Sequence, residues 1–193
     1  PRVIKSHVLT YGNGYTQEFS RTMPESGQAT LTLETCASIN DIPAREWEQL
    51  AGCTNPFLRY EFFQALEASG CTSEATGWSP SHLVFKSDDK IVGLAPAFVK
   101  SHSMGEYVFD WAWADAYQRH GLAYYPKLLI AIPFTPSAGP RLLLAPDLRE
   151  QLTPEQIHDL LDTLTDKLGA HSWHLLFPDS EDQKLLQHDQ ELH

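Results

Sequence analysis

The chain has 193 residues, and 42% of them are hydrophobic, as is typical of a folded globular protein. No uninterrupted apolar run reaches the roughly 20 residues that a membrane-spanning helix needs, so we expect no membrane span. The formal net charge is −11, with 25 acidic and 14 basic side chains. Because binding to a phosphate backbone depends on Lys and Arg, this balance argues against DNA or RNA as the main partner.

The two ends of the chain predict that it is a fragment of a longer protein. Residues 1–28 are polar and lack the regions of a secretion signal, so we expect a disordered or non-native extension there. Met23 is the candidate natural start, and the folded domain is expected over residues 29–193. The chain stops at His193 inside an expected helix, which predicts that the domain is truncated.

The first half of the chain predicts a strand, two helices and a two-stranded hairpin. Asn55 and Pro56 are a typical helix start, because the Asn side chain caps free N–H groups and proline presets the backbone. Gly70 ends that helix, and Asp88 with Asp89 gives the hairpin its turn. The expected elements cover, in order, residues 30–36, 43–50, 55–69, 82–86 and 91–99.

The second half predicts further strands and helices. Two capping boxes, Thr153 with Gln156 and Ser180 with Gln183, indicate helix starts, because each pair satisfies backbone N–H groups reciprocally. Apolar residues recur at helical spacing along the first of these helices until Gly169 ends it. The expected strands cover residues 128–133, 141–144 and 173–177, and the expected helices cover residues 154–168 and 180–193.

This order of elements predicts an α/β sandwich, in the broader sense of an α+β fold, with helices packed on a mixed sheet. The hairpin is antiparallel, and the later strand–helix–strand segment should form a right-handed parallel crossover. The order resembles the acyltransferase fold called GNAT, broken off before its last two strands. Residues 29–193 would then be a first GNAT-like domain.

Aromatic side chains crowd into the segment 101–141. The pattern fits either a strand with its aromatics on one face or a helix from about Asp110 to His120 closed by Gly121. We favour a strand-like entry followed by a helix from about Asp110, because the alanines between the aromatics have high helix propensity. Seven aromatic residues fall within nineteen positions, namely Tyr107, Phe109, Trp111, Trp113, Tyr117, Tyr124 and Tyr125.

Three carboxylates lie among these aromatics, at Glu106, Asp110 and Asp115. A carboxylate is costly to bury unless it pairs with a cation or serves a function. The candidate cationic partners are Arg119, Lys127 and Arg141. Two interpretations remain open, a salt-bridged structural network and a catalytic site.

The longest distinctive motif of the chain runs from Glu106 to Tyr117. Other motifs are Asn55-Pro56-Phe57-Leu58, Glu61-Phe62, Gly70-Cys71, Thr76-Gly77-Trp78, Tyr124-Tyr125-Pro126-Lys127-Leu128, Pro133-Phe134-Thr135-Pro136, Gly139-Pro140-Arg141 and His174-Leu175-Leu176-Phe177-Pro178. From about Ala44 to the chain end, these motifs resemble the bacterial FemAB-like group of predicted N-acyltransferases, described as peptidoglycan biosynthesis or recognition proteins. The resemblance implies a cytoplasmic protein with two tandem GNAT-like domains, of which this chain is similar to the first.

The implied reaction transfers an acyl or aminoacyl group to an amine of a cell-wall precursor or another small acceptor. It needs a base for the amine proton, donors for the oxyanion and an acid for the leaving group. The candidate bases are Glu106, Asp110 and Asp115, and the candidate acids are Tyr117, Tyr124 and Tyr125. His102 and His120 could move a proton near neutral pH, but a lone histidine is more often a surface residue.

A groove for the acyl group or for a small-molecule or muropeptide acceptor is expected in the same segment. Its expected lining residues are Trp111, Trp113, Tyr124, Tyr125, Lys127 and Arg141. We expect this half alone to be inactive.

An acyl-CoA donor in a GNAT fold binds at a glycine-rich helix start, where free N–H groups hold the pyrophosphate. The corresponding helix opens at Thr153-Pro154-Glu155, without a glycine. We therefore expect no cofactor in this half, with acyl-CoA or aminoacyl-tRNA as donor to the full-length protein and the second GNAT-like half as partner. Residues 147–193 carry 11 acidic and 3 basic side chains, so tRNA is not expected on this half.

Metal ligands and activated nucleophiles are not expected. His171 and His174 would point to opposite sides of a strand, so they are unsuited to share a metal. Cys36, Cys53 and Cys71 lack metal-type spacing and basic neighbours, which predicts reduced, buried apolar residues in a cytosolic compartment.

Three hypotheses for function follow. The first is an N-acyltransferase of the FemAB-like type. The second is a non-catalytic module that recognises peptidoglycan or muropeptides, because a Trp- and Tyr-rich cleft with carboxylates can stack on sugars and hydrogen-bond to them. The third is a scaffold half of a tandem enzyme.

Overall fold

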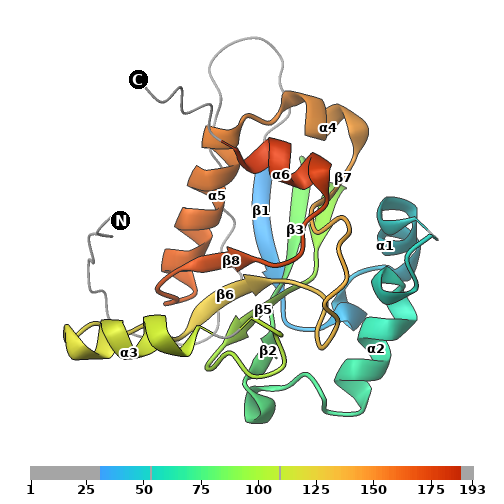
Figure 1. The fold of residues 1–193 in the computed structure, drawn as a ribbon. Coiled ribbons are helices and arrows are strands. Elements are labelled where there is room, and N and C mark those ends of the chain that lie inside the picture. Colours follow the sequence, from blue (N-terminus) through green and yellow to red (C-terminus); the bar gives the residue numbers. More distant parts are fainter. Residues whose placement is uncertain (1–30, 53, 109, 188–193) are drawn as a thin grey trace.

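The structure is a computed structural model that describes residues 31–187, except residues 53 and 109 (Figure 1). The expected N-terminal extension over residues 1–28 and the chain end at residues 188–193 lie outside the described residues. From residue 31 to residue 100 the elements are β1 (Leu31–Cys36), the 3-10 turn η1 (Ile39–Asp41), α1 (Ala44–Ala51), η2 (Pro56–Leu58), α2 (Tyr60–Ala68), η3 (Glu74–Thr76), β2 (Trp78–Pro80), β3 (His82–Ser87), β4 (Lys90–Ala95) and β5 (Ala97–Lys100). After residue 100 they are α3 (Trp111–Arg119), β6 (Lys127–Ile130), β7 (Leu143–Leu144), α4 (Pro146–Gln151), α5 (Pro154–Lys167), β8 (Trp173–Leu175) and α6 (Ser180–Leu186).

Elements with strong local signals form as expected. The turn between β3 and β4 places Asp88 at a positive φ of 52°. The helix predicted in the aromatic segment is α3, which starts after Asp110 and is followed by Gly121 at a φ of 70°. The strand-like entry to this helix is wrong, because residues 101–108 form bends and a turn instead. The predicted capping box of α5 is also present, because Thr153 and Gln156 each accept the other's backbone N–H.

One predicted helix is wrong in its first turn. Asn55 caps only the short η2 turn, and Arg59 then adopts an extended conformation with a ψ of 144°. The α-helix proper, α2, starts at Tyr60, whose N–H donates to Glu48 Oε1 of α1 at 2.7 Å. A carboxylate from another helix therefore supplies the cap, which the local sequence could not indicate.

Three further corrections concern short elements and one residue class. The cap of α6 is Asp179 rather than Ser180, because its carboxylate accepts the N–H groups of the first turn. Four short elements were not predicted: η1, η3, α4 and the three-residue edge strand β2, which contains Pro80 and lacks an alternating pattern. Cys71 is exposed and Cys36 is half-buried, so these two cysteines are not core residues, while Cys53 lies outside the described residues.

The strands form two four-stranded sheets, with the orders β1-β3-β4-β7 and β2-β5-β6-β8. The two arms of the long hairpin run from one sheet into the other, with breaks at Ser81 and Pro96. Across the break, the Ser81 N–H still donates to the Ala97 carbonyl at 2.9 Å. The hairpin therefore connects the two sheets, and it places Trp78 and Lys100 at the end of the β2-β5-β6-β8 sheet that lies away from the β3–β4 turn.

A parallel pair is present as predicted, but it joins β6 to β8, in which Leu128 aligns with Trp173 and Ile130 with Leu175. The strand directly before the crossover helices, β7, pairs with β4 in the other sheet instead. The connection between these strands contains β7, α4 and α5, so it is longer than a simple crossover. The rest of the strand pairing is antiparallel, which makes the β2-β5-β6-β8 sheet mixed as expected.

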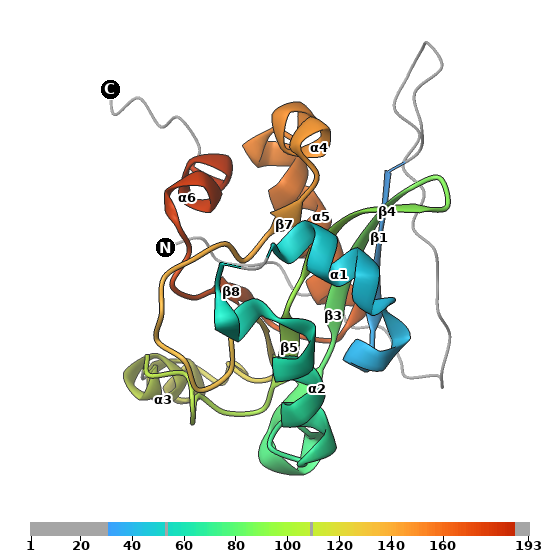
Figure 2. The same cartoon turned by 90° about the vertical axis from the view of Figure 1, so that its right-hand side faces the viewer.

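Helices cover both faces of the sheets (Figure 1 and Figure 2). Helix α5 packs on one face, where Ile157, Leu161 and Leu164 join one buried cluster. Helices α1 and α2 lie on the opposite face, where Trp47 and Phe63 belong to a second cluster. In contrast, α3 projects from the end of the molecule and contains no buried residue. None of the helices described between residues 31 and 187 has both the length and the apolar composition needed to cross a bilayer.

Candidate functional site

A row of three buried side chains crosses the end of the β2-β5-β6-β8 sheet. Trp78 aligns with Lys100 in the β2–β5 pair, and Lys100 aligns with Lys127 in the β5–β6 pair. Lys100 and Lys127 are 0% and 1% exposed. Like charges directly opposite on neighbouring strands are destabilising, so this row requires nearby carboxylates.

Glu106 supplies the first carboxylate. Lys127 Nζ donates to Glu106 Oε2 at 2.7 Å, while Lys100 Nζ lies 3.9 Å from Glu106 Oε1. Oε1 is buried and has no hydrogen-bond partner among the described residues. Burial raises the pKa of Glu106 above its ordinary value, against the lowering effect of the two lysines.

Asp110 supplies the second carboxylate, and it accepts three side-chain hydrogen bonds. Its donors are Lys127 Nζ at 2.5 Å, the Tyr125 hydroxyl at 2.7 Å and the Tyr124 hydroxyl at 2.9 Å. Burial opposes ionisation, but these hydrogen bonds outweigh it and hold the pKa of Asp110 well below its ordinary value. Asp110 precedes α3 without capping it, because its carboxylate faces this network instead.

Both tyrosines act as hydrogen-bond donors at neutral pH. Burial and then the hydrogen bond to Asp110 raise the pKa of Tyr125 to about 12. The same two causes raise the pKa of Tyr124 further above its ordinary value. A hydroxyl that holds its proton this tightly is a poor general acid near neutral pH, so these residues are better suited to orienting Asp110.

Lys100 is held by two contacts besides Glu106. Its Nζ donates to the Met104 carbonyl at 3.2 Å and lies 3.7 Å from the centroid of the Trp78 ring. Burial lowers the pKa of Lys100 to about 8, although the charge of Glu106 acts in the opposite direction. The Trp78 indole N–H also donates to the Met104 carbonyl, at 3.1 Å, which fixes the ring beside the lysine.

Rings extend the network on the side of Tyr124. The Tyr117 ring of α3 lies 5.2 Å from it, edge to face, and the His174 ring of β8 lies 6.1 Å from it. Burial, followed by the charge of Lys127, lowers the pKa of His174 to about 4. His174 is therefore neutral at pH 7, and its Nε2 contacts the Ser172 hydroxyl at 3.0 Å.

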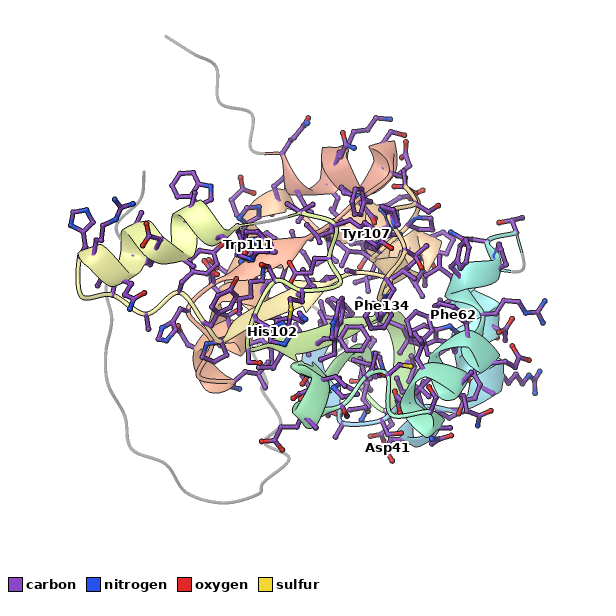
Figure 3. The ribbon with its side chains drawn as sticks, turned by 60° about the horizontal axis from the view of Figure 1, so that its bottom comes forward. Asp41, Phe62, His102, Tyr107, Trp111 and Phe134 are labelled. Atoms are coloured by element: carbon purple, nitrogen blue, oxygen red, sulfur yellow. The ribbon has the colours of Figure 1, made fainter. Side chains whose placement is uncertain are left out.

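The backbone around Glu106 turns sharply. Gly105 has a φ of 82° and Tyr107 has a φ of 60°, which is unusual for a residue with a Cβ atom. The turn directs Glu106 inward, while the Tyr107 side chain is 59% exposed. In Figure 3, α3 projects from the body of the molecule, with Trp111 at its attachment point and Tyr107 over the body.

The structure brings together five of the expected site residues. Glu106, Asp110, Tyr124, Tyr125 and Lys127 form one network, with Tyr117 in contact with its edge. Lys127 is thus the cationic partner that the sequence analysis required.

The other expected site residues lie elsewhere. Asp115 forms an exposed ion pair with Arg119 at 2.8 Å on α3. Trp111 and Trp113 are 62% and 67% exposed on the same helix. His120 is also exposed, at the end of α3.

Arg141 is fully buried and binds the chain itself. Its guanidinium donates to the carbonyls of Leu176, Gly139, Pro140 and Ser137, which fixes the loop before β7. Its burial lowers the pKa of Arg141 to about 10, so it remains charged at neutral pH.

Sequence reasoning missed Lys100, His174 and Trp78 as members of this site. Lys100 ends an apolar strand, and only the β5–β6 register shows that it faces Lys127. The pKa of His102 is lowered mainly by burial and secondly by the positive charge of Lys100. For residues 31–187, apart from 53 and 109, no three His, Cys, Asp or Glu side chains gather as metal ligands would.

A comparison with protein families matches residues 38–193 to the FemAB-like family, whose description is peptidoglycan biosynthesis/recognition. Comparisons with curated proteins and with solved structures gave no match. The family match covers most of the chain and includes the whole buried network. The chain therefore belongs to the FemAB-like family of peptidoglycan biosynthesis/recognition proteins.

Proposed function

We propose that this chain is the acceptor-activating half of an N-acyltransferase, which transfers an acyl or aminoacyl group to an amine of a cell-wall precursor. The observation that carries the proposal is Glu106: it is 3% exposed, one carboxylate oxygen is held by Lys127, and the other has no partner among the described residues. Perturbed buried carboxylates of this kind are frequent at functional sites. The family description supports the cell-wall context.

In this reaction Glu106 is the general base. The amine nitrogen attacks the acyl carbonyl carbon, the N–H proton passes to Glu106 Oε1, and the bond from the carbonyl carbon to the donor's sulfur or oxygen breaks. The proton then passes from Glu106 to the departing thiol or hydroxyl, so the base is regenerated. A carboxylate with a raised pKa is suited to this task, because general base catalysis is most effective when the pKa approaches the working pH.

Asp110 has a different task. It stays ionised, binds Lys127 and aligns the hydroxyls of Tyr124 and Tyr125. Lys127 is thereby fixed between the two carboxylates, and its position determines that of Glu106 Oε2. We assign Asp110 to orientation rather than proton transfer, because its lowered pKa makes it a weak base.

The donor, a CoA thioester or an aminoacyl-tRNA ester, is proposed to bind the second half of the full-length protein. At the start of α5, Thr153 and Gln156 accept two of the N–H groups that a pyrophosphate would need. The acidic side chains of α5 and α6 also disfavour RNA on this face.

The test measures acyl transfer by the full-length protein, with acyl-CoA or aminoacyl-tRNA as donor and muropeptide amines as acceptors, followed by mass spectrometry. Glu106→Gln should lower kcat by about 10²–10⁴-fold, as expected for loss of a general base. Glu34→Gln is the matched control, because Glu34 also accepts from a lysine on a neighbouring strand, at 2.6 Å from Lys86. A folded Glu106→Gln variant with undiminished turnover would exclude this mechanism.

The exposed aromatic residues favour a second candidate, recognition of a muropeptide without catalysis. Trp111 and Trp113 present large stacking surfaces to solvent, which suits sugar rings. Trp111→Ala and Trp113→Ala in the full-length protein should then weaken muropeptide binding, measured calorimetrically. Leu122→Ala is the control, because Leu122 is 58% exposed but has no ring to stack. Binding that both tryptophan variants retain would contradict this candidate, and absence of both binding and turnover would favour a scaffold.

A further inference from the structure

Lys100 is the cation nearest to the free oxygen of Glu106. Its Nζ lies 3.9 Å from Glu106 Oε1, which is close enough for a strong charge interaction and too far for a hydrogen bond. Two contacts hold the ammonium at this distance, the Met104 carbonyl at 3.2 Å and the Trp78 ring at 3.7 Å. The positive charge of Lys100 thus stabilises the carboxylate, while the lone pairs of Oε1 accept no hydrogen bond from it.

The other lysine is shared. Lys127 donates to both Glu106 and Asp110, and its distance to Asp110 Oδ2 is the shorter of the two, 2.5 Å against 2.7 Å. Asp110 receives two tyrosine hydroxyls in addition, whereas Glu106 receives no further hydrogen bond among the described residues. Lys100 is therefore more important for the ionisation of Glu106 than for the ionisation of Asp110.

We propose that Lys100 is a positioning residue for the acyl transfer described above: its charge keeps Glu106 ionised while leaving Oε1 without a hydrogen bond from the part of the chain that the structure describes, so that this oxygen can accept the amine proton. This inference rests on the proposed function, because it assigns a role within the same site. The Lys100 ammonium is held by the Met104 carbonyl and the Trp78 ring, so its role is to act through Glu106.

The other titratable groups around this pair come from three elements. Lys127 faces Glu106 from β6, Asp110 faces it from the start of α3, and Tyr124 and Tyr125 face it from the segment after that helix. The charge of Lys100 also acts on His102, whose pKa is lowered from its ordinary value by burial and then by that charge. The experiment must therefore separate Glu106 from His102.

The experiment is the pH profile of kcat/KM for the full-length protein and its variants. The acid limb of the wild type reports ionisation of the base. Lys100→Met removes the positive charge, so the pKa of Glu106 should rise and the acid limb should move to higher pH by about 1–3 units. At a pH below the original limb, kcat/KM of Lys100→Met should be about tenfold lower than that of the wild type for each unit of displacement. Lys100→Arg keeps the charge and should restore the limb to its original place.

Two controls bracket this result. Lys86→Met removes a lysine that pairs with a carboxylate elsewhere, at 2.6 Å from Glu34, and should leave the limb in place. His102→Gln should also leave it in place, which assigns the limb to Glu106. If Lys100→Met does not fold, Lys100→Gln replaces it, since its amide can still donate to the Met104 carbonyl. A neutral variant that lowers the rate equally at all pH values would overturn the proposal and leave Lys100 a purely structural role.

A direct titration separates this inference from the proposed function. The ¹³C chemical shift of the Glu106 carboxyl, assigned with Glu106→Gln, reports its pKa whether or not the protein catalyses transfer. A pKa that rises in Lys100→Met, in a protein with no transferase activity, would support the charge effect and remove the catalytic role. An unchanged pKa would overturn the inference even in an active enzyme.

Discussion

Gly105 and Phe134 are packed so closely that a Cβ atom added to Gly105 would lie 2.7 Å from Phe134 Cε1. The Phe134 ring lies 5.2 Å from the ring of Trp78, which in turn carries the Lys100 ammonium. Because Glu106 is the next residue after Gly105, this contact fixes where the chain enters the buried network. The shape of one small residue thus contributes to the geometry of the carboxylate.

Gly105→Ala should destabilise the protein more than Gly121→Ala does. Both glycines have positive φ values, 82° and 70°, so both substitutions carry the cost of a left-handed alanine, about 1–2 kcal/mol. Of these two glycines, Gly105 has neighbours within 4 Å of the added Cβ atom and Gly121 has none. We expect a further loss of about 1–3 kcal/mol for Gly105→Ala, measured by urea denaturation. Equal losses in the two variants would contradict the packing argument.

Asp110→Asn should lower the free energy of unfolding at pH 7 by about 3 kcal/mol, because it breaks a buried pair and leaves Lys127 short of a partner. Asp115→Asn is the control, since Asp115 is 62% exposed and its ion pair with Arg119 contributes little.

The stability difference between the wild type and Asp110→Asn should depend on pH. The folded-state pKa of Asp110 lies below the ordinary value of 3.8, so its stabilising contribution is complete above about pH 4. That contribution is lost as the pH falls below 4. The stabilities of the wild type and of Asp110→Asn should therefore converge in acid, and a constant difference between pH 7 and pH 3 would contradict the assignment.

His174 predicts a separate pH window. Its pKa is lowered from 6.5 to about 4 by burial and then by the charge of Lys127. Between these pH values His174 is protonated in the unfolded chain and neutral in the folded chain. Stability should fall as the pH decreases from 6.5 to 4. His174→Gln should flatten this part of the curve, whereas His120→Gln, at an exposed position, should leave it unchanged. Urea midpoints at pH 7, 5.5 and 4.5 would measure the effect.

Arg141 and Arg119 offer a matched pair of substitutions. Arg141→Lys should cost at least about 3 kcal/mol, because lysine cannot reach the four carbonyls that the buried guanidinium binds. Arg119→Lys should change stability by less than about 0.5 kcal/mol, because that side chain is 68% exposed. Thermal unfolding of both variants would distinguish a structural Arg141 from a replaceable one.

The parts of the fold that could be predicted from the sequence are those with signals inside the element itself. The box of Thr153 and Gln156 and the glycine after α3 mark helix ends through neighbours a few residues away. The start of α2 could not be located, since its cap is the side chain of Glu48 in another helix. Similarly, β2 is held by its pairing with β5 rather than by its own pattern.

The same distinction applies to the site. Glu106, Asp110 and Lys127 could be singled out because carboxylates among aromatics require a cation. Which carboxylate pairs with which cation could not be derived, since this depends on the side chains that the end of the sheet brings together. Arg141 is an example: it was expected to pair with a carboxylate or to line the groove, and the structure places its guanidinium on four carbonyls of its own chain. Lys100 is visible only through strand register.

Helix α3 contributes no buried residue, and the network at its base is anchored in the sheet instead. Mutations on the outward faces of α3 therefore act on what the protein contacts and hardly at all on whether it folds. Substitutions there can introduce new aromatic and polar surfaces without being removed by selection for stability. Under the proposed function, acceptor preference could therefore change through α3 while Glu106 and Asp110 beneath it stay the same.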